Sequence, residues 1–253
     1  MLKTRLMPAL LLRGAGLVKT VKFKDPKYVG DPINTVRIFN EKEVDELIFL
    51  DITATAEKRS PPFELLAEIA SECFMPFAYG GGLRTVEDIG RLFALGAEKA
   101  SLNSYALEQP AFIREAADTY GSQSIIVSMD VRRGWLGRPR VYTDGGRAAT
   151  SWDPADWARE VEQRGAGEIL LTSIDRDGTF QGYDVELIER VTSAVSIPVI
   201  ACGGAGRLED FAAAVNEGGA SAVAAGSMVV YQGPHRAVLI SFPARAELQR
   251  VLT

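Results

Sequence analysis

The sequence predicts a closed (β/α)8 barrel, and three observations support this fold class. The chain has 253 residues, 47% of them hydrophobic, which is enough for the large core of such a barrel. Short apolar segments alternate with segments of helical periodicity, as in a parallel sheet covered by helices. The chain also repeats itself once at half its length, which indicates two similar half-barrels. We expect a single domain over residues 1–253.

The apolar segments predict the strands. In chain order they read LMPALLL, ELIFLDI, PFAYG, KASLN, SIIVSMD, EILLTSI, PVIAC and AVAAG. Between them apolar residues recur at helical spacing, for example at Phe63, Leu66 and Ile69. Eight strand–helix units of roughly 30 residues each suit a closed barrel. An open doubly wound sheet is the alternative, although no G-x-G-x-x-G motif follows the first strand to support it.

The internal repeat pairs the third strand with the seventh. PFAYGGGLRTVEDI, which begins at Pro76, resembles PVIACGGAGRLEDF, which begins at Pro198. GAEKASLNS at Gly96 likewise resembles GASAVAAGS at Gly219. Under this symmetry the first strand corresponds to the fifth, yet only the fifth carries a carboxylate, Asp130, near its end.

Two segments interrupt the regular spacing. Residues 14–32 form a long basic excursion after the first strand, with glycine and proline near its ends, which suggests a mobile lid. Residues 132–146 are typical of a hairpin inserted after the fifth strand. Both segments follow strands, so both are expected at the carboxyl-terminal face, where barrel enzymes have their active sites.

Composition and the rarer residues exclude several classes of function. The chain has 28 basic and 33 acidic residues, a net charge of -5, so it lacks the basic field expected of a partner for nucleic acid or an anionic membrane. The apolar run near the start contains Pro8 and stops at Arg13, which suits neither a signal peptide nor a membrane span. Cys73 and Cys202 have no metal-ligand spacing and are expected as reduced thiols in a cytoplasmic protein. His235 has no neighbouring acid or second histidine and is expected on the surface or at the start of a helix, so we predict neither a metal nor a cofactor.

Glycine-rich turns follow the third and seventh strands, at residues 80–82 and 203–206. Small polar residues follow the fourth and eighth strands, as Asn103-Ser104 and Gly226-Ser227. Glycines let backbone N–H groups approach an anion closely at the start of a helix, so the duplicated pattern predicts two phosphate cradles on opposite sides of the mouth. The alternative is that the glycines only permit tight turns between strand and helix.

Acidic residues stand at the carboxyl-terminal ends of predicted strands, namely Asp51, Asp130, Asp175 and Asp177. An acid that projects into a barrel mouth can serve as a general acid or base. Such residues can also cap a helix or hold a loop, which is an equally good interpretation of Asp175. Asp130 differs, because it ends an otherwise apolar strand.

Charged residues also open four of the strands, namely Arg5, Glu46, Lys99 and Glu168. Two cations and two anions that faced inward could form a closed ring of ion pairs at the barrel floor. Four separate residues in contact with water at the rim are the other possibility.

Five segments are distinctive together: FLDITATAEKR, FAYGGGLRT, GAEKASLNS, GAGEILLTSIDRDGTFQGYD and ACGGAGRLEDF. They resemble the HisF-type cyclase subunit of imidazole glycerol phosphate synthase, and the resemblance covers nearly the whole chain. It implies a (β/α)8 barrel that receives ammonia from a HisH-type glutaminase docked on its N-terminal face. The barrel then passes the ammonia to its carboxyl-terminal mouth.

The resemblance also implies roles for individual residues. Arg5, Glu46, Lys99 and Glu168 correspond to the family's ammonia gate, and Asp130 to one of its two catalytic aspartates. With the acids and polar turns above, the positions expected to bind phosphate or substrate are Lys19, Asp51, Gly82, Asn103, Ser104, Asp177, Gly178, Gly204, Gly226 and Ser227.

The chain departs from the family pattern at the first strand. The second catalytic aspartate is expected in C-L-D-V-K-D-G, where this sequence has ALLLRGA with Leu11 in place of the acid. Leucine cannot transfer a proton, and loss of one positioned acid or base typically costs about 10²- to 10⁴-fold in rate. Asp25 or Asp31 in the lid could substitute. Cyclisation is therefore in question, whereas ammonia delivery is not affected.

YVGDP at residues 28–32 and GPHRAVLISFP at residues 233–243 resemble paralogues that accompany bacterial surface-polysaccharide genes. This resemblance implies a complex with a glutaminase and a third, amidotransferase subunit, which converts an acetamido group on a nucleotide sugar into an acetamidino group. The main hypothesis is thus an ammonia-delivering subunit for O-antigen synthesis. The alternatives are a genuine cyclase of histidine biosynthesis, a lyase, and a scaffold without catalysis that activates the glutaminase.

Overall fold

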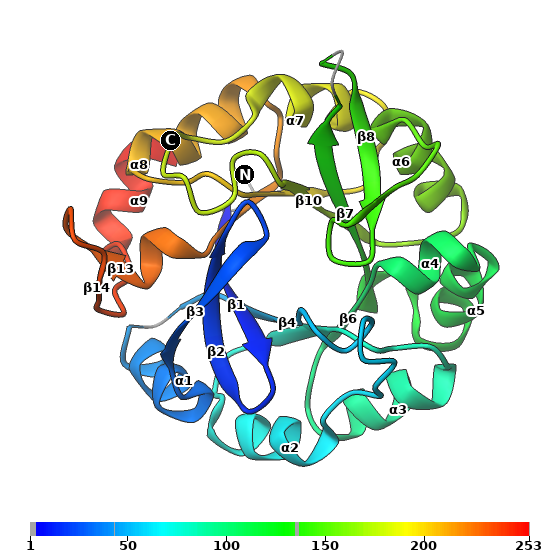
Figure 1. Cartoon of the computed structure of the whole chain (residues 1–253), viewed down its shortest axis with the longest axis horizontal. Helices are drawn as coiled ribbons and strands as arrows, with labels where there is room; N and C mark the ends of the chain where they lie inside the picture. The colour runs from blue at the N-terminus through cyan, green and yellow to red at the C-terminus, as the bar shows by residue number, and fades with distance from the viewer. Residues whose placement is uncertain (1–3, 43, 135–136, 253) are drawn as a thin grey trace.

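The computed structural model describes residues 4–42, 44–134 and 137–252, and its centre is a closed ring of eight parallel strands (Figure 1). In order around the ring these are β1 (Arg5–Arg13), β4 (Leu47–Asp51), β5 (Phe77–Gly80), β6 (Lys99–Leu102), β7 (Ile125–Arg133), β10 (Glu168–Ser173), β11 (Val199–Cys202) and β12 (Ala222–Ala225). Pairing of β12 with β1 and of β10 with β7 closes the ring. Each predicted apolar segment forms one of these strands, so the predicted (β/α)8 barrel is confirmed and the open sheet is wrong.

Helices surround the strands (Figure 1). They are α1 (Pro32–Glu41), α2 (Phe63–Glu72), α3 (Val86–Ala94), α4 (Ser104–Glu108), α5 (Ala111–Tyr120), α6 (Pro154–Gln163), α7 (Val185–Thr192), α8 (Leu208–Ala212) and α9 (Arg245–Leu252). Several begin at a short polar residue whose side chain accepts a hydrogen bond from the first turn. The Asp31 carboxylate accepts from the backbone N–H of Asn34, and Thr85 Oγ1 accepts from that of Asp88.

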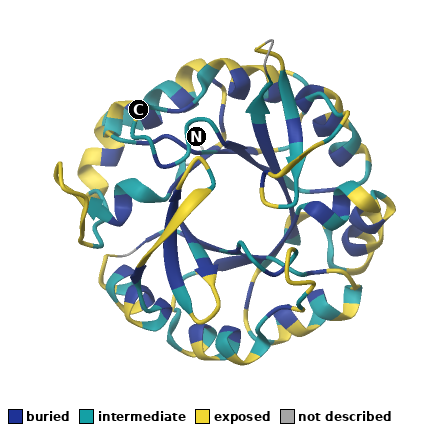
Figure 2. Ribbon diagram, in the orientation of Figure 1, coloured by how far each residue is buried: buried dark blue, intermediate teal, exposed yellow. Residues whose placement is uncertain are grey.

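Two apolar layers hold the barrel together. The outer layer, between strands and helices, contains large buried side chains such as Phe39, Phe49 and Trp157. The inner layer fills the barrel and consists of Met7, Ala9, Ile48, Ala78, Ile126, Leu170, Ile200, Ala222 and Ala224. Figure 2 shows the same division, with buried strands and with helices that are exposed on their outer sides. The barrel interior is therefore an apolar column rather than a water-filled pore.

An antiparallel hairpin follows the first strand of each half. After β1 come β2 (Gly16–Val21) and β3 (Lys24–Gly30), and β2 pairs with the end of β1. After β7 come β8 (Pro139–Thr143) and β9 (Ala148–Ala149), and β8 pairs with the end of β7. The hairpin predicted for residues 132–146 is confirmed. The excursion predicted as a lid is a second hairpin, the blue β2–β3 ribbon beside the ring in Figure 1.

The rarer residues lie as follows. Both cysteines are free thiols, and His235 is exposed in the turn between the short strands β13 (Tyr231–Gln232) and β14 (Ala237–Val238). Within the described ranges, no helix is both long enough and apolar enough to cross a membrane.

Candidate active site at the barrel mouth

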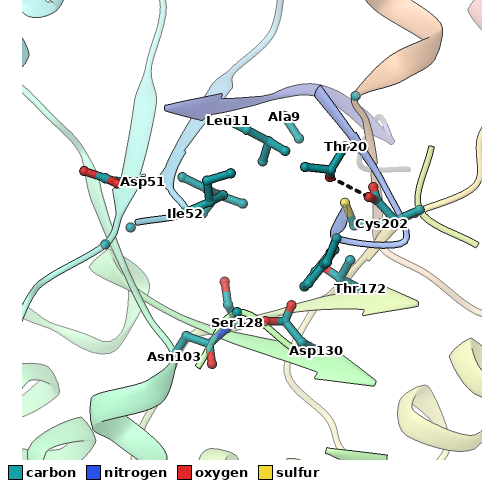
Figure 3. A pocket seen from close by; sticks show the side chains of 18 of the residues that line it. Ala9, Leu11, Thr20, Asp51, Ile52, Asn103, Ser128, Asp130, Thr172 and Cys202 are labelled. Carbon is teal, nitrogen blue, oxygen red and sulfur yellow. Dashed lines mark hydrogen bonds between the residues drawn. The ribbon is translucent and has the colours of Figure 1, made fainter. Parts of the chain in front are cut away.

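A cavity of about 270 Å³ opens at the carboxyl-terminal ends of the strands (Figure 3). Both halves of the barrel contribute to its wall. The predicted site residues that line it are Leu11, Lys19, Asp51, Asn103, Ser104, Asp130, Asp177, Gly178, Gly204, Gly226 and Ser227. Gly82 lines a separate, smaller depression of about 40 Å³, which shares Gly81, Asn103 and Ser104 with the main cavity. The fold therefore brings nearly all of the predicted set to one place.

Asp130 projects from β7 into this cavity and is buried. Asn103 Nδ2 donates a hydrogen bond of 2.7 Å to Asp130 Oδ2. Burial raises the pKa of Asp130 to about 6, and the nearby charge of Asp177 adds to this, whereas the hydrogen bond from Asn103 opposes it. A carboxyl group with such a pKa can both give and take a proton near neutral pH.

The wall that faces Asp130 is apolar. Leu11 projects from β1, which lies four strands from β7 around the eight-stranded ring, and Figure 3 shows Leu11 and Asp130 on opposite sides of the cavity. The two lid acids do not replace the missing carboxylate. Asp31 caps α1, Asp25 is exposed on the β2–β3 hairpin, and neither belongs to the cavity lining.

A buried cation lies at the side of the mouth where Gly226 follows β12. Lys19, on β2, is only 5% exposed, and its ammonium group donates a hydrogen bond to the carbonyl oxygen of Ala9. Burial lowers the pKa of Lys19 to about 8, against the opposing effect of Asp177. A Cβ at Gly226 would lie 2.7 Å from Lys19 Nζ, so a larger residue there would displace the ammonium group. Lys19, Gly226 and Ser227 together offer donors to an anion.

Asp177 connects the β2–β3 hairpin to the loop after β10. Its carboxylate accepts a hydrogen bond of 3.0 Å from Thr20 Oγ1, and its carbonyl oxygen accepts one of 2.9 Å from the backbone N–H of Lys22. Burial raises the pKa of Asp177, although Lys19 and Thr20 act in the opposite direction. Asp177 thus holds the hairpin against the mouth as well as lining the cavity.

The turn between β8 and β9 closes the side of the mouth where Ser104 follows β6. The backbone N–H of Asp144 donates a hydrogen bond of 3.1 Å to Ser104 Oγ. The Asp144 carboxylate pairs with Arg147, with 2.6 Å between Arg147 Nη2 and Asp144 Oδ1. Asn103 Oδ1 is buried without a hydrogen-bond partner among the described residues, which leaves an acceptor for a ligand.

Two of the predicted acids hold loops. The Asp51 carboxylate turns away from the centre of the cavity (Figure 3) and accepts hydrogen bonds from the backbone N–H groups of Thr53 and Ala54, each 3.0 Å long. It also pairs with Arg59 at 3.1 Å. Asp175 accepts a hydrogen bond of 2.9 Å from the backbone N–H of Arg133. The carboxylates of both residues therefore hold neighbouring backbone in place, as the alternative interpretation of such acids predicts.

Sequence analysis missed several lining residues, namely Thr20, Phe23, Ser101, Ser128, Asp144, Arg147, Thr172 and Cys202. Strand alternation could have identified Ser128, because it precedes Asp130 by two positions and so faces the same side. Its hydroxyl lies 2.7 Å from that of Ser101. Cys202 was expected only as a reduced thiol, and burial raises its pKa to about 12, which keeps the thiol protonated.

At the opposite end of the barrel the four strand-opening charges form a closed ring of ion pairs. Arg5 contacts Glu46 at 2.5 Å and Glu168 at 2.9 Å, and Lys99 contacts the same two carboxylates at 3.1 and 3.2 Å. The side chain of Glu46 is 5% exposed and that of Lys99 15%, so the ring is largely withdrawn from water. The apolar column lies between this ring and the mouth.

The chain matches the histidine biosynthesis protein family over residues 5–235. It is 53% identical to the protein named "Putative imidazole glycerol phosphate synthase subunit hisF2" of Pseudomonas aeruginosa, over 96% of this chain and 97% of that protein. It is 48% identical to the imidazole glycerol phosphate synthase subunit HisF of Alkaliphilus metalliredigens, over 91% and 92% of the two chains. The subunit HisF of Hyphomonas neptunium is 49% identical over 90% of each chain.

Proposed function

Because this chain belongs to the HisF family of imidazole glycerol phosphate synthase subunits, we propose that it is the barrel subunit of a glutamine-dependent complex. A HisH-type glutaminase docks on its N-terminal face, and ammonia passes through the barrel to the mouth. A third, amidotransferase subunit then uses the ammonia to form an acetamidino group on a nucleotide sugar for surface polysaccharide. Ring closure of the histidine precursor is weak or lost.

The observation that carries this proposal is Leu11 on the wall that faces Asp130. A cyclase that works with two acids needs a proton donor or acceptor on each side of its substrate. Here one side offers a leucine side chain, and neither Asp25 nor Asp31 lines the cavity. The remaining acid can act on one side only.

Ammonia delivery is supported by the chemistry of the side chains between the two ends of the barrel. The column above the ring of Arg5, Glu46, Lys99 and Glu168 consists of Met7, Ala9, Ala222 and other apolar side chains. Moving an ion into such surroundings costs far more than moving a neutral molecule. The column therefore favours neutral ammonia over ammonium, and the ion-pair ring is the only charged layer that ammonia meets below the mouth among the described residues.

A second candidate function is the cyclase itself, and Asp130 is the observation in its favour. Its pKa of about 6 suits acid–base catalysis near neutral pH, and Asn103 holds its carboxylate toward the cavity. If Asp130 and a ligand's own groups suffice, the chain makes imidazole glycerol phosphate.

A direct assay separates these two functions. The purified chain is given the bisphosphorylated histidine intermediate and free ammonium, with the Alkaliphilus metalliredigens relative as the reference. We expect a turnover at least about 100-fold below that of the reference, because one positioned acid is absent. Comparable turnover, or rescue of a histidine-requiring strain that lacks its cyclase, would contradict the proposal.

Delivery is tested in the reconstituted complex with an acetamido nucleotide sugar as acceptor. Lys99→Glu should break the floor ring, and Ala78→Leu should fill the column at a second place. We expect glutamine-dependent product to fall while product from added ammonium chloride, which enters at the mouth, is kept. If glutamine remains coupled to product in both folded variants, the chain acts as a scaffold that activates the glutaminase.

A further inference from the structure

The hairpin of β7 and β8 has one buried and one free face. Val131 pairs across the strands with Val141, and both side chains are buried in the outer apolar layer. Side chains alternate along a strand, so the neighbouring pairs project to the other face. That face carries Asp130 opposite Tyr142 and, one step further from the barrel, Arg132 opposite Arg140. The wall that carries Asp130 therefore continues outward into a pair of arginines.

This arginine pair is not neutralised within the described part of the chain. Arg132 and Arg140 are directly opposite in an antiparallel ladder, where like charges destabilise the sheet. Neither guanidinium forms an ion pair there, whereas the next residue, Arg133 on the other face, contacts Asp184 at 3.1 Å and Glu186 at 2.9 Å. Among the residues that the structure describes, the fold thus supplies counter-ions for the arginine on the Val131 face and none for the two on the Asp130 face.

Contacts of Arg132 hold its guanidinium at the rim of the cavity. The group lies over the ring of Tyr142, with 5.0 Å between its Cζ and the ring centroid. Its Nη2 also lies 3.6 Å from the position that a Cβ on Gly146 would take. Gly145 and Arg147, on either side of Gly146, line the cavity, so Arg132 lies next to the lining without being part of it. Arg147 is already paired with Asp144, whereas Arg132 has no ion pair within the described part of the chain.

We propose that Arg132 and Arg140 form an anion subsite at the rim, which binds a phosphate group of the ligand that occupies the mouth. Guanidinium groups bind phosphate oxygens in pairs of parallel hydrogen bonds, and two adjacent forks suit a diphosphate. The ligand class is a nucleoside diphosphate, whose phosphates contact the arginines while the nucleoside extends into the cavity. This proposal takes one premise from the proposed function, namely that a ligand occupies the mouth.

The test measures binding to the purified full-length chain alone, by isothermal titration calorimetry with uridine diphosphate. Arg132→Gln and Arg140→Gln remove the two charges separately and together. Arg138→Gln is the matched control, because Arg138 is an exposed arginine of the same hairpin that lies further from Asp130. Inorganic phosphate is titrated in parallel, since a free anion can bind beside Lys19 without the rim.

We expect each rim substitution to lower the affinity for uridine diphosphate by about tenfold or more, which is the usual effect of losing a charge-assisted hydrogen bond. Arg138→Gln should change the affinity less than about twofold, and inorganic phosphate should bind all variants equally. Thermal unfolding midpoints of the rim variants should equal or exceed that of the native chain, because a like-charge pair is removed.

Three results would overturn the subsite. The first is that the double variant and the native chain bind uridine diphosphate with equal affinity, or that neither binds it measurably. The second is that Arg138→Gln loses as much affinity as the rim variants. The third is that the rim variants have a lower thermal unfolding midpoint than the native chain. An equal loss in Arg138→Gln would instead indicate a broad basic surface for an acidic protein. No glutaminase or ammonia is involved, so these outcomes are independent of the delivery experiment.

Discussion

Leu11 on β1 and Asp130 on β7 face each other across the mouth of the barrel, four strands apart in a ring of eight. The two strands hold corresponding places in the two halves, and each continues into an antiparallel hairpin. The backbone is thus nearly symmetric at this level, whereas the chemistry is not. Of the two facing positions, only Asp130 carries a group that can transfer a proton.

Restoring the missing acid should restore cyclisation. In Leu11→Asp the new carboxylate enters the cavity opposite Asp130, and we expect ammonium-dependent turnover of the histidine intermediate to rise by about 10²-fold or more. Leu11→Asn, which has the same shape without the charge, is the control. Turnover by Leu11→Asp no higher than by Leu11→Asn would show that more than one acid has been lost.

Asp130 should make the protein less stable as the pH rises. Its pKa is raised from 3.8 to about 6 by burial, so the folded chain binds this proton more tightly than the unfolded chain does. The free energy of unfolding should therefore fall between pH 4 and pH 6 and then level off, by about 3 kcal/mol from this group. Urea unfolding of the native chain and of Asp130→Asn at pH 4 and pH 7 checks this. Equal pH dependence in both would contradict a buried, titrating Asp130.

Anion binding at the mouth should weaken above pH 8. Lys19 has a pKa of about 8 because it is buried, and it can attract an anion only while it is protonated. Sulfate is a suitable probe because its own charge is constant in this range. We expect its dissociation constant to rise by about tenfold or more between pH 7 and pH 9.5, and to be high at both pH values in Lys19→Met. An unchanged affinity in Lys19→Met would place the anion elsewhere.

The floor ring should contribute to stability as well as to delivery. Lys99→Met leaves Glu46 and Glu168 with Arg5 as their only partner in the ring, and the free energy of unfolding should fall by about 1 to 3 kcal/mol. Arg37→Met removes an exposed ion pair with Glu72 and should leave the unfolding midpoint unchanged. Chemical denaturation of the two variants makes the comparison. Equal effects would mean that the ring is solvated like any surface pair.

Strand order, the half-barrel repeat and the inserted hairpin could all be predicted from the sequence. Each depends on a local pattern, such as the apolar run EILLTSI or the glycine-rich turn after PFAY, because burial on both faces of a strand requires a continuous apolar segment. The position of Asp130 at the mouth follows in the same way, since the end of a barrel strand defines its place in the fold.

The tertiary structure alone decided which side chains meet. Arg5 reaches Glu168, 163 positions away in the chain, only because β1 and β10 are in the same closed ring. The same applies to Asp51, whose carboxylate accepts hydrogen bonds from the following loop, and to Arg132, which lacks the counter-ions that Arg133 has. The sequence by itself determined the strands and the polar or charged residues at their ends. The contact partners of those side chains depend on distances between segments that are remote in the chain. These distances become short only once the barrel has closed.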